Sequence, residues 1–173
     1  MANTTFDGPV RSKNGFINLG PGMTKSLTAD TTLSVQEHAG RILLLNDADG
    51  KFTLPSINVN ADSAVAGPGS DPNNLNNIGA SFYFYIETAA TDLDIKTDGT
   101  DKFTGAVMLA VDDGAKKAFV PAAANDVMTF DGGTAGGLAG SVVQVTAVDT
   151  NNYLVHNSLV IATGTIVTPF ANA

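Results

Sequence analysis

The chain has 173 residues, a formal net charge of -8 at pH 7 and no cysteine, and 43% of its residues are hydrophobic while 15% are charged. This length and composition suit one globular domain with a sizeable core, with room for a short arm. The lack of cysteine excludes disulfides and thiolate chemistry, and the excess of acidic residues argues against direct binding of nucleic-acid phosphates.

The first 24 residues are predicted to form an extended arm in front of a body that spans residues 25–173. They lack the apolar centre of a secretory signal, and no run in the chain reaches the roughly 20 apolar residues of a membrane helix, so we expect no membrane partner. Residues 1–25 carry a charge of +2, which leaves -10 for the rest of the chain. Isolated apolar side chains in this segment are separated by polar and turn residues. This pattern favours an arm that lies across the surface of a partner, and a frayed terminus is the alternative. The predicted anchors are Phe6, Pro9, Val10, Arg11, Phe16 and Ile17.

The body is predicted to be all-β, as a single antiparallel sandwich of jelly-roll type. Helical periodicity is hard to find, whereas short apolar or alternating runs bounded by Gly, Asn and Asp recur about every ten residues. We expect roughly eight to ten strands from this spacing. Hairpins are predicted over residues 42–54, with the turn at 46–50, over 105–121 and over 141–164, and residues 165–170 are predicted to form a last strand.

Two segments lack the periodicity of strands. Residues 58–79 are crowded with Asn, Asp, Gly and Pro, and are predicted to form a long exposed loop. Residues 131–140, with the sequence DGGTAGGLAG, are predicted to be either a mobile tip or a place where another backbone approaches closely.

Residues 81–86 read SFYFYI and alternate two kinds of aromatic side chain. Phe82 and Phe84 lie on one face of the predicted strand, and Tyr83 and Tyr85 lie on the other. Because aromatic side chains lie on both faces of this strand, we expect both faces to be covered, either in a central strand or in a contact between subunits. We therefore predict an oligomer interface at Phe82, Tyr83, Phe84 and Tyr85.

No set of residues in the sequence resembles a catalytic centre. The chain has two glutamates, Glu37 and Glu87, and two histidines, His38 and His156. Neither histidine is accompanied by a serine in a Gly-x-Ser-x-Gly elbow, and most aspartates sit in turn-like contexts. We expect structural roles for these residues, no catalytic residue and no enzymatic activity.

Metal and cofactor binding are not predicted either. Asp47, Asp49 and Gly50 resemble a piece of a calcium loop, but the first and twelfth ligand positions do not carry the required side chains. A turn explains them better, and the same holds for Asp112 and Asp113. We expect no metal and no cofactor.

Several short motifs resemble small virion structural proteins of tailed bacteriophages, particularly those of marine and cyanobacterial phages. The opening MANTTFDGPVRSKNGF is similar to the start of such proteins. The segment LTADTTLSVQEHAGRILLLNDADGKFTLPSI resembles a β module that recurs in them, with a Leu-Thr-Ala opening, an aliphatic strand, an Asp-Gly turn and a Thr-Leu-Pro return. The later GASFYFYI and TGTIVTPF resemble the middle and the end of that module.

This resemblance implies a virion protein, and the acidic body with its arm favours a capsid decoration, or cement, protein. Such a protein binds the major capsid protein on the outer surface of the shell, after assembly in the host cytoplasm, and is often a homotrimer. The implied partners are therefore the major capsid protein and further copies of this chain, without direct contact to nucleic acid. A tail or head-fibre component is the alternative within the same resemblance.

Overall fold

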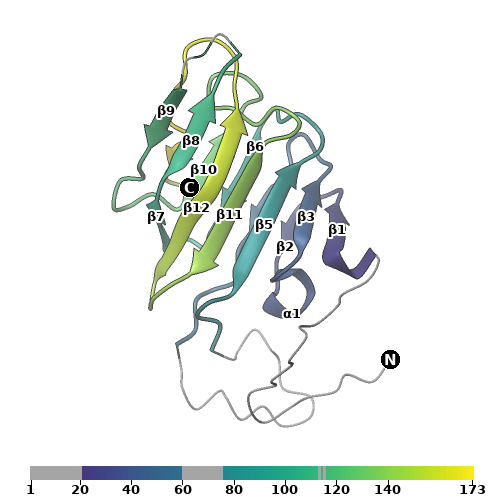
Figure 1. Ribbon diagram of the computed structural model, residues 1–173. Coiled ribbons are helices and arrows are strands. Elements are labelled where there is room, and N and C mark those ends of the chain that lie inside the picture. The colour runs from purple at the N-terminus through teal and green to yellow at the C-terminus, as the bar shows by residue number, and fades with distance from the viewer. Residues whose placement is uncertain (1–20, 60–75, 113, 115) are drawn as a thin grey trace, which may run out of the picture.

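The computed structural model describes residues 21–59, 76–112, 114 and 116–173 (Figure 1). It contains a 3-10 turn, η1, one short helix, α1, and strands that account for most of the regular structure, as the prediction of an all-β body requires. The elements in chain order are η1 (Pro21–Met23), β1 (Thr24–Leu27), β2 (Thr31–Thr32), α1 (Val35–His38), β3 (Ile42–Leu45), β4 (Lys51–Thr53), β5 (Ser81–Ile86), β6 (Leu93–Lys96), β7 (Lys102–Gly105), β8 (Val107–Ala110), β9 (Lys116–Phe119), β10 (Val127–Phe130), β11 (Val142–Ala147), β12 (Asn152–Ile161) and β13 (Phe170–Ala171).

The strands form two sheets that pack face to face as a sandwich. Sheet 1 has eight strands in the order β1-β3-β5-β11-β12-β8-β9, and β7 also pairs with β12. Sheet 2 has five strands in the order β13-β10-β6-β4-β2. In Figure 1 sheet 1 faces the viewer and sheet 2 lies behind it.

The first half of the body is a stack of three β-arches, each made of one strand in sheet 1, a turn, and one strand in sheet 2. The arches are β1–β2, β3–β4 and β5–β6, and their strands pair in parallel with the next arch in both sheets. The predicted hairpin over residues 42–54 is therefore wrong, because β3 pairs with β1 and β5 whereas β4 pairs with β2 and β6.

Backbone hydrogen bonds between successive turns explain this arrangement. Asn46 N donates to Leu27 O at 2.9 Å, Thr91 N donates to Ala48 O at 2.7 Å, and Asp94 N donates to Gly50 O at 3.0 Å. Each turn thus satisfies the polar backbone of the neighbouring arch, so the return strand is free to cross to the other sheet. The predicted antiparallel sandwich is therefore wrong in its strand directions, since six of the eleven strand pairings among the described residues are parallel. A jelly-roll order is not confirmed.

The second half of the body follows the sequence-based predictions more closely. β8 and β9 form an antiparallel hairpin, and so do β11 and β12. The predicted last strand is present as β13, which pairs with β10. The segment 131–140 makes the close backbone approach that was one of its two predicted roles, because a Cβ on Gly132 would lie 2.1 Å from Ala90 O.

The short helix α1 was not predicted. Ser34 is its N-cap, and the Ser34 hydroxyl accepts a hydrogen bond from Glu37 N at 3.3 Å. A serine followed three residues later by a glutamate is the sequence signature of a helix start, so the signal was present in the sequence.

The core lies between the two sheets and is built from alternate residues of their strands. Tyr153 of β12 is fully buried, and its hydroxyl donates to Pro55 O at 2.5 Å, which joins sheet 1 to the segment after β4. The largest fully buried side chains are Tyr153, Phe52, Phe82, Phe84, Phe130, Leu33, Leu43, Leu45, Leu54, Ile86, Leu93 and Ile95.

Gly105 joins β7 to β8, which pair with successive parts of β12. Its φ is 92°, and a Cβ there would lie 2.2 Å from Val155 O. We predict that Gly105→Ala lowers the free energy of unfolding through both the left-handed backbone, at about 1–2 kcal/mol, and the clash, at about 1–3 kcal/mol more.

Gly99 provides the matched control for this prediction. Its φ is 94°, but nothing lies within 4 Å of the position of its Cβ. Gly99→Ala should therefore show the backbone cost alone in urea unfolding. Equal losses for the two variants would contradict a close approach at Gly105.

Candidate functional site

The outward face of sheet 1 brings together apolar side chains from strands that are far apart in the sequence. Strand register places Ile42 beside Tyr83, and it places Tyr85 beside Val142, which in turn lies beside Leu159. We call this surface the outer patch. Its members are Ile42, Leu44, Tyr83, Tyr85, Met108, Val142 and Leu159.

The outer patch is accessible in the single chain. Six members have exposed fractions between 37% and 51%, while Leu44 is half-buried. Single exposed apolar side chains are ordinary on a protein surface, but neighbouring ones on one sheet face mark an interaction site. None of the outward side chains that the structure describes on β3, β5, β11 and β12 is Asp, Glu, Lys or Arg.

The outward face of sheet 2 has a different character. Lys51 Nζ contacts a carboxylate oxygen of Asp94 at 3.1 Å, and the Thr129 hydroxyl donates to the same carboxylate at 2.7 Å. Ion pairs and hydroxyls of this kind suit a face that meets water. The two sheets therefore differ in what their outer faces can contact.

A chain of hydrogen-bonding side chains borders the outer patch across three strands. The Ser81 and Thr146 hydroxyl oxygens are 2.6 Å apart, and Thr146 Oγ1 lies 2.8 Å from His156 Nε2. Beside them, Asn157 Nδ2 donates to Gln144 Oε1 at 2.8 Å, and the positive φ of Asn157 marks the bulge where β12 shifts register against β11. None of these groups forms a hydrogen bond with a carboxylate in the described part of the chain, so the arrangement offers hydrogen-bonding capacity rather than the oriented base of a catalytic triad.

The structure divides the four residues predicted to form an oligomer interface. Tyr83 and Tyr85 point outward with exposed fractions of 42% and 37%. Phe82 and Phe84 are 0% and 2% exposed, because β5 turns alternate side chains to opposite faces and these two lie between the sheets. Their assignment to an interface is wrong, and they belong to the core.

The predicted arm anchors Phe6, Pro9, Val10, Arg11, Phe16 and Ile17 lie outside the described residues. So does most of the predicted loop over residues 58–79. The described ends of that loop are held together, since Asn58 N donates to Asn77 Oδ1 at 2.8 Å and Asn77 N donates to Asn58 O at 3.0 Å.

Helix α1 accounts for one glutamate and one histidine. Glu37 pairs with Lys25 Nζ at 2.6 Å, and this hydrogen bond and charge hold the pKa of Glu37 below its usual range. His38 is 4% exposed, and its Nδ1 accepts a hydrogen bond from Ser34 N at 2.9 Å. Both residues serve the cap of the helix.

The turn that resembled part of a calcium loop crosses between the sheets at residues 46–50. Partial desolvation and the neighbouring carboxyl group of Asp49 raise the pKa of Asp47. No group of three or more His, Asp or Glu suited to hold a metal ion occurs among the described residues.

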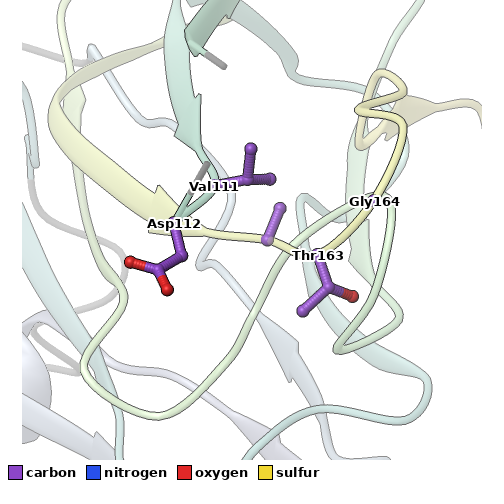
Figure 2. Close-up of a pocket in the computed structure, with 5 residues that line it drawn as sticks. Val111, Asp112, Thr163 and Gly164 are labelled. Atoms are coloured by element: carbon purple, nitrogen blue, oxygen red, sulfur yellow. The ribbon is translucent and has the colours of Figure 1, made fainter. Parts of the chain in front are cut away.

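A shallow hollow of about 330 Å³ lies at the end of β8 and β12 and is lined by Val111, Asp112, Ala162, Thr163 and Gly164. Figure 2 shows the carboxylate of Asp112 and the hydroxyl of Thr163 turned to different sides. Because a binding site needs polar groups that converge on one ligand, this hollow is a weaker candidate than the outer patch.

Comparison of the chain with protein-family models, curated proteins and solved structures gave no significant match. No helix within the described ranges is long and apolar enough to cross a membrane. The outer patch is the candidate functional site that the structure itself supplies.

Most members of the outer patch were missed by sequence reasoning. The alternation in residues 81–86 revealed Tyr83 and Tyr85, but Ile42, Val142 and Leu159 were predicted only as parts of hairpins, without an assigned face. Their exposure depends on which strands become neighbours, and no local pattern encodes that pairing.

The buried imidazole of His38 predicts a dependence of stability on pH. Burial lowers the pKa of His38 below its ordinary value of 6.5, with the nearby Lys25 charge in support. The unfolded chain therefore binds more protons than the folded chain as the pH falls below 6.5, so the free energy of unfolding should decrease in that range. His38→Asn keeps an acceptor for Ser34 N and cannot become protonated, so it should lose this part of the pH dependence in urea titrations at pH 7.5 and 5.5.

His156→Gln serves as the control for that measurement, because it changes a histidine on the outward face of sheet 1. It should retain the decrease in stability that His38 causes. The same pH dependence in the wild type and in His38→Asn would show that His38 is not its source.

Proposed function

We propose that the protein is a capsid decoration protein of a tailed bacteriophage, a structural subunit without enzymatic activity. In this proposal it binds the major capsid protein on the outer surface of the shell through its N-terminal arm. Its bodies associate as a trimer, and the whole assembly stabilises the shell without covalent bonds.

The observation that carries the proposal is the outer patch. An acidic protein that exposes an uncharged apolar face on a rigid two-sheet body is suited to lasting contact with other proteins. The side chains beside the patch form hydrogen bonds and do not provide an oriented catalytic base, which supports a structural role.

The place where the arm joins the body gives further support. Residues 21–23 form η1 and lead directly into β1, the edge strand of sheet 1 (Figure 1). An arm attached there begins at one edge of the sheet that carries the outer patch. Sheet 1 therefore carries the outer patch on its face and the attachment point of the arm at its edge.

The energetics suit reinforcement by many weak contacts. Burial of Phe6, Val10, Phe16 and Ile17 would contribute ~1.5 to 3 kcal/mol each before the cost of ordering the arm. Docking of the body raises the effective concentration of the arm at its binding site, which offsets part of that cost.

The stack of three parallel arches favours a second candidate, a tail or head-fibre component. Stacked strand-turn units are the building principle of elongated solenoid proteins. Cryo-electron microscopy of the virion separates the two candidates, because a decoration protein gives density over the shell and a fibre component gives density at the tail or on projecting fibres.

We predict that the full-length variant with Phe6, Val10, Phe16 and Ile17 all changed to Ser loses most of its binding to capsids, because the arm then buries no apolar anchor. Occupancy is measured by cosedimentation of purified protein with capsids that lack it. Circular dichroism and thermal unfolding should match the wild type, since all four changes precede the body.

The matched control changes four polar positions of the same arm, Asn3, Thr4, Thr5 and Ser12, to Ala. This variant should keep near wild-type occupancy. If the serine variant also binds capsids at wild-type occupancy, the arm is not the capsid-binding element and the proposed mechanism is wrong.

A further inference from the structure

We propose that the outer patch contacts a second copy of this chain, and that Lys116 of one copy meets Glu87 of the next across this contact. The inference deepens the proposed function, because it rests on the association of bodies and specifies the surface and the charges that direct it.

The overall charge restricts how two copies can approach each other. Each copy carries a formal charge of -8, so most orientations bring exposed carboxylates together. The central strands of sheet 1 present an outward face without a charged side chain in the described residues. Two copies that meet there bury apolar surface and avoid most of the repulsion between their carboxylates.

Lys116 lies at one edge of this face. β9 is the edge strand of sheet 1 at the opposite edge from β1, and Lys116 pairs with Ala110 of β8. Lys117 faces the other side of the strand, where its Nζ lies 4.8 Å from the centre of the Phe119 ring. Lys116 is therefore an exposed cation on the outward side of the strand, and it forms no ion pair with any described residue.

Glu87 lies at the same end of the sheet but several strands away. It follows Ile86 directly, and Glu87 N donates to Leu45 O at 3.0 Å, so the alternation that exposes Tyr83 and Tyr85 continues to Glu87. Its side chain is exposed and has no cationic partner within the described part of the chain.

Topology places the two charges at one level of the face. β5, β12 and β8 run in the same direction, because β5 and β12 are both antiparallel to β11 and β8 is parallel to β12. Glu87 follows the end of β5, and Lys116 starts β9 after the end of β8. The strands β11, β12 and β8 separate them (Figure 1).

A surface with this arrangement is complementary to a copy of itself. When two such faces pack with their strands aligned and rotated by a two-fold axis along the strands, Lys116 of each copy stands over Glu87 of the other. In a closed ring, Lys116 of each copy meets Glu87 of the next. A second copy of the chain carries the anion that matches Lys116 and the cation that matches Glu87. We therefore assign a second copy as the partner that covers the outer patch.

The test measures the mass of the purified full-length protein by light scattering over a range of concentrations. The wild type should form an oligomer with a mass two or three times the 17.7 kDa of the chain. Lys116→Glu and Glu87→Lys should each raise the dissociation constant by about tenfold or more, because each brings like charges together, and the double exchange should restore most of the association.

Lys117→Glu is the matched control. It changes the net charge as Lys116→Glu does, at the neighbouring residue, but on the side of β9 that faces away from the contact. Its dissociation constant should stay within about twofold of the wild type. Tyr85→Asp, which puts a charge inside the patch, should yield monomers whose circular dichroism spectrum matches that of the wild type.

A wild type that stays at 17.7 kDa at the highest concentration overturns the inference, and so does an equal effect of Lys116→Glu and Lys117→Glu. A mixed complex with a different protein, formed through the patch while the pure chain stays monomeric, would identify another occupant. These outcomes do not depend on capsid binding. Cosedimentation of the arm variant tests capsid binding, whereas light scattering of the pure protein measures the association of the bodies.

Discussion

The parallel register of the three arches is the constraint on which the rest of the body depends. It aligns Leu27 with Leu45 and Leu45 with Ile86, so each arch sends its apolar side chains to the same side. Because side chains alternate along a strand, a shift of one residue would turn the buried phenylalanines of β5 outward and its tyrosines inward. The core and the outer patch are two results of the same register.

The two sheets use that register differently. Sheet 2 covers the core with one face and meets water with the other, where lysine, carboxylate and hydroxyl groups pair. Sheet 1 covers the same core but carries aromatic and aliphatic side chains on its outward face. Such a face is costly for a chain that acts alone, and it is useful to a chain that assembles with others, which is why the proposed function and the inferred contact both involve sheet 1.

Charged side chains at the rim of the outer patch determine how a partner can be oriented on it. Lys25, Lys51 and Lys102 are held in internal ion pairs, as Lys25 is with Glu37 at 2.6 Å and Lys102 with Asp126 at 2.7 Å, whereas Lys116 forms no ion pair with a described residue and lies at the rim of the outer patch. A cation without a carboxylate partner at the rim of an uncharged face is therefore informative, because it can select the orientation of a partner although it contributes little affinity. The histidines, in contrast, are used for packing and hydrogen bonding within the body.

The sequence by itself determined the all-β class, the alternation of residues 81–86 and the hairpins β8–β9 and β11–β12, because each rests on residues that are close along the chain. It also indicated the last strand, although the pairing of that strand with the distant β10 was decided by the tertiary structure. Ser34 and Glu37 are also a local signal for the start of helix α1, although the helix was not predicted. Only the tertiary structure decided that β3 and β4 belong to different sheets, since a turn is compatible with a hairpin or an arch, and hydrogen bonds to distant strands select between them. The outer patch was decided in the same way, because Ile42, Tyr85 and Leu159 are spread over more than a hundred residues of chain and reach one face only through the pairing of β3, β5, β11 and β12.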